Sequence, residues 1–514
     1  MNGAQTLLKT LADSGIDTCF ANPGTSEMQL VSALGETPEI RAVLCLFEGV
    51  VTGAADGYAR MADRPALTLL HLGSGLSNGL ANLHNARRAG SAVVNVVGDH
   101  ATYHLQYDAP LTSDLPGLAA WTSSWSHVAP SADALPALGA EAVRASRAGN
   151  GGIATLIAPA DCAWEQSNAP VTVASPAVTP TVDPEHLGRL VEELQVDRPR
   201  AFFLGGRALR EDCLTALGRI AAATGARLIC QTFPTRLQRG AGRVAVERLP
   251  YFAEQATASL DGLEQLILVG CAAPVSFFAY PGKESWLTPP GCEIVTLASA
   301  TENIAGALAF ITQGLEADGE PVVRSGHVPD LPGDAPLNAE AIGNAIAALL
   351  PENAIIVDEG VTGGLAVYLL TEGAAPHDWL TLTGGAIGQG LPVALGAAIA
   401  RPSRKVIALQ ADGSAMYTVQ ALWSMVREQT DVTVVLLNNR SYAILAIELD
   451  RVGAGNDNDK TRSLFDLSRP DMDFCAIAAG LGMRASRAST GSEFAQQFGA
   501  AMATPGPCLI EAMV

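Results

Sequence analysis

The strongest chemical pattern in the sequence lies in KVIALQADGSAMYTVQALWSMVREQTDVTVVLLNNRSY, residues 405–442. Asp412 follows one apolar run, and Asn439 follows the next such run 27 residues later. A strand, a helix and a second parallel strand fit this length, and they bring both side chains to one edge of a sheet. A carboxylate and an amide oxygen that meet there suit Mg²⁺ and leave positions open for phosphate oxygens. In isolation, a helix cap at Asp412 and a turn at Asn439 explain the residues equally well.

A second candidate is Glu48, which lies in the apolar stretch RAVLCLFEGVVTGAADGYARM, residues 41–61. A carboxylate removed from water is costly unless it is paired or protonated. The sequence therefore predicts either a structural ion pair or a group that shares a proton with a ligand.

The elements that position these residues are short apolar runs that alternate with Gly- and Ala-rich helical stretches. The runs include ALTLLHL (66–72), AVVNVVGD (92–99), AFFLGG (201–206), LEQLILVG (263–270) and AIIVDEG (354–360). Such alternation predicts parallel sheets with helices on both faces, and these sheets bind ligands at the carboxyl ends of their strands. The polar residues at those ends are His71, Asp99, Glu359, Asp412 and Asn439.

Two segments interrupt the alternation and divide the chain. Residues 166–184 and 318–337 are rich in Pro and small polar residues and have no helical period. They predict an α/β protein of three domains, at 1–165, 184–318 and 337–514, each a parallel sheet flanked by helices.

Composition narrows the class of protein further. The 514 residues are 48% hydrophobic and carry a formal charge of −20, which argues against a nucleic-acid partner. The nine cysteines are scattered and include no CxxC, so we expect reduced thiols, a cytoplasmic location and no zinc site. No signal peptide and no apolar stretch of 18 residues is present, so we expect no membrane span.

The run from Asp412 to Asn439 resembles the Gly-Asp-Gly to Asn-Asn motif of the thiamine-diphosphate-dependent 2-oxo acid decarboxylases and carboligases. Ala411 replaces the first glycine of that motif. The resemblance implies that Asp412 and Asn439 bind Mg²⁺ through their side chains and Ser441 through its carbonyl. It also implies that Gly413 and Ser414 bind the diphosphate at a helix N-terminus.

Two further stretches resemble the same family. LCLFEGVVTGAADGYAR is similar to the segment whose glutamate reaches N1′ of the aminopyrimidine, which gives Glu48 the role of generating the reactive ylid. TGGAIGQGLPVALGAA, residues 383–398, is similar to the loop whose bulky residue bends the cofactor, here Ile387. Glu359, at the end of its strand, is a further candidate for cofactor binding.

Substrate-site residues follow from a resemblance to benzoylformate decarboxylase. NPGTSE (22–27) and LLHLGSG (69–75) resemble segments that carry a catalytic serine and histidine there, so Thr25 and His71 are the candidates here. His71 would move protons. Read alone, a histidine at a strand end is more often structural.

The second catalytic histidine of benzoylformate decarboxylase is absent from the similar run CAAPVSFFAYPGK, where Phe277, Phe278 and Ala279 stand. His100 and His104 are candidates for the missing proton relay, with solvent-facing loop histidines as the alternative.

The run NNRSYAILAIELDRVG, residues 438–453, is more similar to the acetolactate synthase large subunit. There, Ile444 and Leu445 fall where relatives shape the substrate pocket. Because the middle part has no clear flavin-binding motif, we do not expect FAD.

Together these resemblances imply an enzyme with pyrimidine-binding, central Rossmann-like and diphosphate-binding domains. It would use thiamine diphosphate and Mg²⁺ to decarboxylate a small-molecule 2-oxo acid, or to ligate the resulting enamine to a second carbonyl. In this family the cofactor lies between domains of different subunits, so a homodimer or homotetramer is expected.

Two other functions stay open. Gly73, Gly75 and Gly79 after a strand, with Asp99 beyond, resemble a dinucleotide-binding turn, although their spacing is GxGxxxG rather than GxGxxG. An NAD- or flavin-binding oxidoreductase is therefore one alternative. A catalytically silent subunit that binds thiamine diphosphate is the other.

Overall fold

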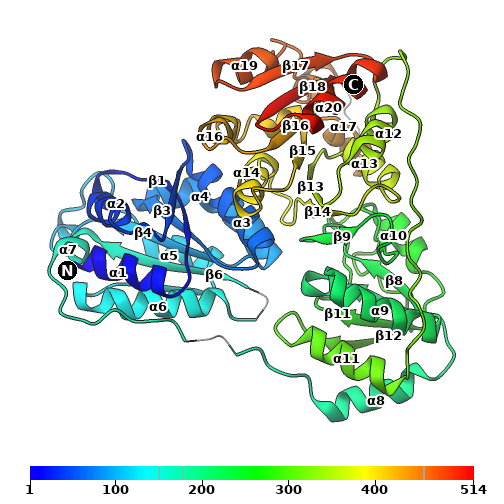
Figure 1. The fold of residues 1–514 in the computed structure, drawn as a ribbon, viewed down its shortest axis with the longest axis horizontal. Coiled ribbons are helices and arrows are strands. Elements are labelled where there is room, and N and C mark those ends of the chain that lie inside the picture. The colour runs from blue at the N-terminus through cyan, green and yellow to red at the C-terminus, as the bar shows by residue number, and fades with distance from the viewer. Residues whose placement is uncertain (150, 176–177, 455–457) are drawn as a thin grey trace.

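The chain folds into three sheets, each covered by helices (Figure 1). The computed structural model describes residues 1–149, 151–175, 178–454 and 458–514, so residues 176 and 177 of the predicted first linker lie outside the described residues. The three-domain α/β prediction is confirmed. The second predicted linker runs along the outside of the molecule from α11 (Ile304–Gly314) to α12 (Ala339–Leu349).

The first sheet has six strands in the order β2-β1-β3-β4-β6-β5, and every pair is parallel. Its strands are β1 (Thr18–Asn22), β2 (Arg41–Leu44), β3 (Ala66–His71), β4 (Val93–Asp99), β5 (Trp125–Val128) and β6 (Ile153–Pro159). Its helices are α1 (Gly3–Asp13), α2 (Met28–Gly35), α3 (Glu48–Ala62), α4 (Leu72–Ala89), α5 (Leu115–Thr122), α6 (Leu135–Ser146), α7 (Ala160–Trp164) and the 3-10 turns η1 (Thr25–Glu27), η2 (Leu105–Tyr107) and η3 (Ala132–Ala134). Every residue of β4 is buried, as expected for a strand covered on both faces.

The middle sheet has five parallel strands in the order β10-β8-β7-β11-β12. They are β7 (Arg200–Leu204), β8 (Arg227–Cys230), β10 (Glu247–Arg248), β11 (Gln265–Val269) and β12 (Glu293–Ala298). The helices of this part are α8 (Pro184–Leu194), η4 (Gly206–Leu209), α9 (Glu211–Thr224), α10 (Ala253–Leu260) and α11.

The third sheet has seven strands in the order β17-β18-β16-β15-β13-β14-β9. They are β9 (Leu237–Arg239), β13 (Ala354–Glu359), β14 (His377–Thr381), β15 (Val406–Ala411), β16 (Val432–Asn438), β17 (Arg484–Ala488) and β18 (Cys508–Met513). Its helices are α12, α13 (Gly364–Leu370), α14 (Gly390–Ala400), α15 (Asp412–Ala415), α16 (Ala421–Arg427), α17 (Ala443–Arg451), α18 (Asp459–Ser463), α19 (Phe474–Gly480) and α20 (Gly491–Ala503).

The edge strand β9 departs from the predicted arrangement. It belongs to the middle segment of the chain, yet it pairs antiparallel with β14 of the third sheet, with Leu237 opposite Trp379 and Arg239 opposite His377. Residues 184–318 therefore do not form a self-contained unit. The three residues of β9, LQR, are too few to show the alternation of a strand. The sequence therefore gave no sign that this strand of the middle segment joins the third sheet.

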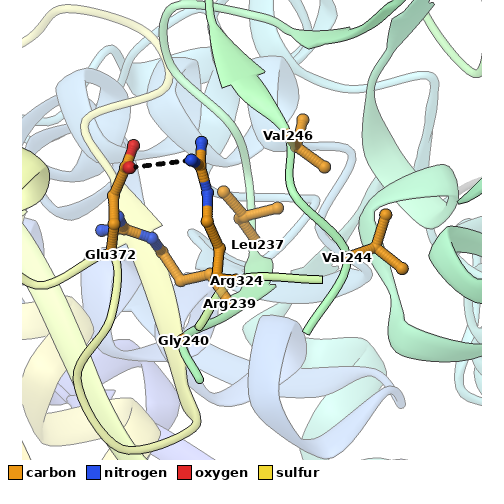
Figure 2. Close-up of a pocket in the computed structure, with 7 residues that line it drawn as sticks. All are labelled: Leu237, Arg239, Gly240, Val244, Val246, Arg324 and Glu372. Atoms are coloured by element: carbon orange, nitrogen blue, oxygen red, sulfur yellow. Dashed lines mark ion pairs between the residues drawn. The ribbon is translucent and has the colours of Figure 1, made fainter. Parts of the chain in front are cut away.

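A small cavity lies at this junction (Figure 2). Its volume is about 10 Å³, and Arg324 lies 3.3 Å from Glu372 beside it. Such a space holds about one water molecule and is far too small for a nucleotide. The lining residues are Leu237, Arg239, Gly240, Val244, Val246, Arg324 and Glu372.

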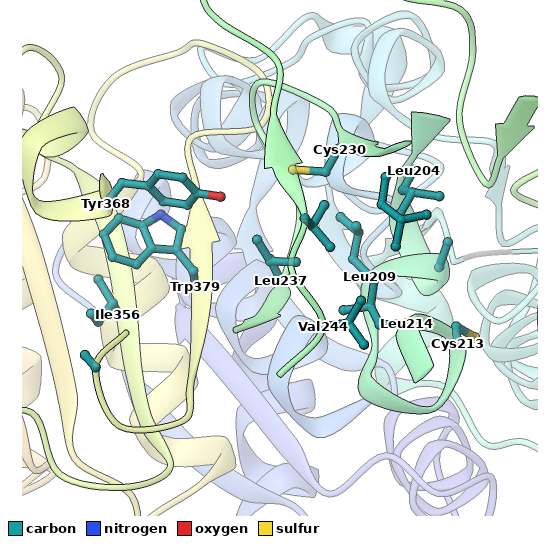
Figure 3. Close-up of a cluster of buried hydrophobic side chains, with 14 of the residues drawn as sticks. Leu204, Leu209, Cys213, Leu214, Cys230, Leu237, Val244, Ile356, Tyr368 and Trp379 are labelled. Carbon is teal, nitrogen blue, oxygen red and sulfur yellow. The ribbon is translucent and has the colours of Figure 1, made fainter. Parts of the chain in front are cut away.

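Hydrophobic cores cross the borders between the domains. Trp379 and Tyr368 of the third domain share one buried cluster with Leu237 and Leu204 of the middle segment (Figure 3). A second cluster joins α3 of the first domain to α14 of the third. A Cβ at Gly396 would lie 1.9 Å from the Ala54 carbonyl oxygen, so α3 and α14 pack in direct backbone contact. The three domains are therefore one packed body.

In the part of the chain that the structure describes, every helix is too short or too polar to span a bilayer.

Candidate active site

The predicted metal ligands meet at the carboxyl ends of β15 and β16. Asp412 is the first residue of α15, and one of its carboxylate oxygens, Oδ2, accepts a 2.7 Å hydrogen bond from the backbone N–H of Arg440. Arg440 lies in the left-handed region (φ 57°) between Asn439 and Ser441. The side chain of Asn439 is exposed, and its Oδ1 accepts from Ser441 N–H at 3.0 Å. Burial raises the pKa of Asp412, while neighbouring backbone N–H groups oppose that rise. Hard oxygen atoms thus gather here, as Mg²⁺ requires.

The turn after β15 differs in detail from the prediction for diphosphate binding. The N–H of Gly413 donates to Oδ1 of Asp412 at 2.7 Å, so it is already occupied. Gly413 is needed for space instead, because a Cβ there would lie 2.2 Å from the ring of Tyr442. Ser414 is buried, and its hydroxyl faces the carbonyl of Ala411 at 3.5 Å. Diphosphate contacts from Gly413 and Ser414 stay predictions.

Glu48 begins helix α3, and its side chain is nearly fully buried. Its partners are two amides: Asn22 donates to Oε1 at 3.0 Å, and Asn78 donates to Oε2 at 2.9 Å. The structural alternative was an ion pair, whereas these two hydrogen bonds come from neutral groups. A carboxylate with only neutral donors can hold or release a proton without breaking a salt bridge.

Glu359 lies at the end of β13 and organises the loop that carries Ile387. Oε1 accepts from the N–H groups of Gly388 (2.7 Å) and Gln389 (3.2 Å), and Oε2 accepts from Gly390 N–H (2.7 Å). The side chain of Gln410 adds a fourth bond at 2.8 Å. Burial raises the pKa of Glu359, and these four donors counteract the rise. Its carboxylate is therefore engaged with the loop, and a direct cofactor contact of Glu359 stays a prediction.

Helix α4 holds the same loop from the first domain. Asn85 donates to the carbonyl of Ala386 at 2.7 Å and accepts from its N–H at 3.2 Å. Asn82 donates to the carbonyls of Gly49 and Gly388. Ile387 is half-buried, and hydrogen bonds from the first domain and from the third hold the backbone on either side of it.

His71 forms a cluster with two residues that the sequence did not single out. Its Nδ1 lies 2.8 Å from Oε2 of Glu27, whose carboxylate is completely buried, and 3.2 Å from the hydroxyl of Ser26. A Cβ at Gly24 would lie 2.3 Å from the His71 ring, so the chain passes directly over the imidazole. Thr25, the predicted catalytic hydroxyl, is exposed, and the hydroxyl beside His71 belongs to Ser26. A role for Thr25 stays a prediction.

One sequence feature could have revealed Glu27. Glu27 is the last residue of the run NPGTSE, which also contains Thr25 and resembles a segment of the substrate site. Only the packing of η1 against the ends of β3 and β4 shows that its carboxylate turns inward to His71.

His100 and His104 lie together in the loop after β4, with their ring centroids 5.3 Å apart. β4 is the neighbour of β3, and His71 is paired with Gly98 across the two strands. The two rings therefore stand beyond the end of the strand next to His71, and their part in a proton relay stays a prediction.

Phe277 joins the middle segment to the Ile387 loop. A Cβ at Gly385 would lie 2.6 Å from the tip of the Phe277 ring. Phe277 also packs edge-on against Phe278 at 4.8 Å between ring centroids. Ile444 and Leu445 lie on α17, a helix with no buried residue, and Leu445 is 42% exposed.

The glycines that resembled a dinucleotide-binding turn lie inside a helix. α4 begins at Leu72, directly after β3, so Gly73, Gly75 and Gly79 are helical. A Cβ at Gly79 would lie 2.8 Å from Thr52 of α3. Gly79 therefore serves helix packing, and the expectation of a glycine turn beside His71 is wrong.

Comparison with known protein families identifies both ends of the chain. Residues 1–118 match the N-terminal TPP-binding domain of thiamine pyrophosphate enzymes, and residues 362–512 match the C-terminal TPP-binding domain. The chain belongs to the thiamine pyrophosphate enzymes. In this thiamine pyrophosphate enzyme, Glu48 and His71 lie in the N-terminal match, and Asp412 and Asn439 lie in the C-terminal match. The predicted family is confirmed.

Curated relatives cover the thiamine pyrophosphate enzyme from end to end. The protein named "Putative acetolactate synthase large subunit IlvX" of Mycobacterium tuberculosis H37Rv is 53% identical and covers 100% of this chain and 99% of its own length. Benzoylformate decarboxylase of Pseudomonas aeruginosa is 30% identical, with coverage of 97% and 96%.

Among solved structures, the thiamine diphosphate-dependent 4-hydroxybenzoylformate decarboxylase of Rhodococcus jostii RHA1 superposes with a TM-score of 0.88. It is 23% identical and covers 100% of this chain and 99% of its own. At this identity the likeness establishes the fold of the thiamine pyrophosphate enzyme, with its three parallel-sheet domains.

Proposed function

We propose that this enzyme binds thiamine diphosphate together with Mg²⁺ and uses them to decarboxylate a 2-oxo acid. The observation that carries the proposal is the contact between Asp412 Oδ2 and Arg440 N–H, which joins the ends of β15 and β16 at the position of the metal motif. Ligation to a second carbonyl is the other outcome available to this chemistry.

The donor set at this sheet edge fits a hard divalent cation. Asp412 supplies a carboxylate, Asn439 an exposed amide oxygen and Ser441 a backbone carbonyl, and all are oxygen atoms of the kind that Mg²⁺ prefers. These residues would hold Mg²⁺, which in turn would neutralise the diphosphate. The remaining coordination positions would be left for phosphate oxygens and water.

Glu48 would face the aminopyrimidine of the cofactor. When bound, thiamine diphosphate supplies a nucleophilic carbon that adds to a keto group and accepts electrons as CO₂ leaves. The part of Glu48 is to hold a proton at its carboxylate, where Asn22 and Asn78 fix both oxygens. Ile387, on its anchored loop, would shape the bound cofactor.

His71 would move the proton that completes the reaction. With Nδ1 held by Glu27, the other ring nitrogen is left to give and take a proton, because the buried carboxylate fixes the orientation of the ring. This pair supports protonation to an aldehyde as the main outcome.

The residues at the predicted substrate end are apolar. Ile444, Leu445 and Phe277 carry no charge, and the run that resembles the histidine-bearing segment of benzoylformate decarboxylase has Phe277, Phe278 and Ala279 instead. This supports a 2-oxo acid with an apolar side chain. His104 would line the polar side of the same pocket.

We also propose that the enzyme acts as a homodimer or homotetramer. Support comes from α17, where Leu445 and Ile447 are 42% and 40% exposed in the single chain. A second copy would cover such side chains. Light scattering of the purified protein measures the assembly directly.

The test of the function is a titration of metal-stripped protein with thiamine diphosphate, with and without Mg²⁺, followed by circular dichroism and calorimetry. CO₂ release is then measured from pyruvate, a branched 2-oxo acid and benzoylformate. Mg²⁺-dependent binding with turnover of the apolar substrates is expected. Binding without turnover of any 2-oxo acid would favour the silent subunit instead. A bound NAD or flavin chromophore would favour the oxidoreductase.

A further inference from the structure

Helix α3 carries a buried ion pair that the proposed chemistry does not use. Arg60 binds Asp56, one helical turn earlier, through Nε at 2.7 Å and Nη2 at 2.6 Å. Both side chains have zero exposure. A pair buried so completely is not needed for stability alone, since apolar residues often serve as well.

The pair reaches from the first domain to both ends of the loop that carries Ile387. Arg60 donates to the carbonyl of Thr381 and to the hydroxyl of Thr383, both at 2.9 Å. These contacts hold the segment where the loop leaves β14.

Asp56 holds the other end of the loop through Gln389. The side-chain amide of Gln389 donates to Oδ2 of Asp56 at 2.6 Å, while its backbone N–H donates to Glu359 at 3.2 Å. Gln389 therefore bridges a carboxylate of the first domain and one of the third. Ser91 also bonds Asp56, so both carboxylate oxygens have partners on more than one element.

We propose that Asp56, Arg60 and Gln389 are positioning residues that clamp residues 381–390 and so set the place of Ile387 against the cofactor. The inference rests on the proposed function, because it takes Ile387 as the residue that meets thiamine diphosphate. The buried charges act on the loop conformation, since three of their side-chain hydrogen bonds beyond the pair itself join Thr381, Thr383 and Gln389, while the bond from Ser91 holds Asp56 within the first domain.

Gln389→Leu is the most specific variant. It removes the hydrogen bond from the Gln389 amide to Asp56, keeps the side-chain size and leaves the Asp56–Arg60 pair intact. Thr383→Val acts at the opposite end of the loop and removes two bonds, the one from Arg60 and the one that the Thr383 hydroxyl donates to the carbonyl of Asn85 at 2.8 Å. The matched control is Gln265→Leu, a buried glutamine of β11 whose amide donates to Glu193 at 3.2 Å in the middle sheet. Asp56→Asn is left as a second step, because an unpaired Arg60 is a strong threat to folding.

The first measurement needs no cofactor. Hydrogen exchange is followed by mass spectrometry in a peptide spanning residues 384–391 of the cofactor-free protein. Gln389→Leu should speed exchange there about tenfold, the effect of losing one buried hydrogen bond. Thr383→Val, which loses two bonds, should speed it by at least as much, and Gln265→Leu should leave it unchanged. Unchanged exchange in both loop variants would overturn the clamp.

The second measurement is the affinity for thiamine diphosphate with Mg²⁺, by calorimetry and by the circular dichroism of the bound cofactor. The loop variants should bind about tenfold more weakly and show an altered dichroic band, while Gln265→Leu matches the parent. Faster exchange with unaltered binding and spectrum would overturn the role of the clamp in placing Ile387. Failure of the parent to bind the cofactor is a different result, and it would refute the proposed function together with this inference.

Discussion

The Nδ1 atom of His71 lies 2.8 Å from Oε2 of Glu27, a carboxylate that is completely buried between η1 and the ends of β3 and β4. Its second oxygen has no room to move, because a Cβ at Gly98 would lie 1.9 Å from Oε1 of Glu27. The carboxylate is therefore fixed in front of one ring nitrogen, and the side chain of His71 is 19% exposed.

His71→Ala should lower kcat for decarboxylation about 100-fold, the usual effect of losing a positioned proton carrier. Glu27→Gln should lower kcat about tenfold, because an amide holds Nδ1 of His71 by a weaker hydrogen bond than a carboxylate does. If the two residues act as a unit, the double variant should cost no more than His71→Ala alone. A double-mutant cycle measures this coupling from the kcat values of the parent, the two single variants and the double variant. Fully additive losses would show that Glu27 and His71 act independently.

Glu48→Gln should leave the fold intact and lower turnover by about 10²–10⁴-fold, because the amide cannot hold the proton at this site. Steady-state CO₂ release measures the loss, and the far-ultraviolet circular dichroism spectrum reports the fold. Glu39→Gln, on the exposed surface of the same domain, is the matched control. Near-normal turnover in Glu48→Gln would make Glu48 a structural acid.

Asp412→Ala should lose Mg²⁺-dependent retention of thiamine diphosphate, by at least about tenfold in the midpoint of a Mg²⁺ titration, because a ligand has been removed. Gel filtration followed by assay of the retained cofactor measures this. The exposed Asp318→Asn serves as the control. Retention equal to that of the parent would show that the metal site lies elsewhere.

His377 predicts an acid sensitivity that is separate from the chemistry. Burial, with nearby Arg239 adding to it, lowers the pKa of His377 to about 3. The unfolded chain protonates this ring below about pH 6.5, so stability is full above that pH and is lost as the pH falls toward 3, by up to about 1.4 kcal/mol per pH unit.

Between pH 7 and pH 5, His377 should lower the free energy of unfolding of the parent by about 2 kcal/mol, and His377→Gln should abolish that loss. Urea unfolding at the two pH values gives the free energies of unfolding. His127→Gln changes an exposed histidine and should retain the acid sensitivity of the parent. An equal pH dependence in His377→Gln and the parent would rule out His377 as the cause.

The parallel α/β architecture and the family could both be predicted from the sequence. Long apolar runs such as those of β4 and β15 can be buried only in a sheet covered on both faces, so their pattern is local and readable. The spacing from Asp412 to Asn439 also fixed their meeting, because one crossover returns the chain to the neighbouring strand.

Contacts between residues far apart in the chain became visible in the folded structure alone. Glu27 faces His71 across 44 positions, and Asp56 meets Gln389 across 333. No periodicity encodes such a pair, because each depends on how whole elements pack. The same reason explains β9, whose pairing with β14 follows from the packing of the middle segment on the third domain.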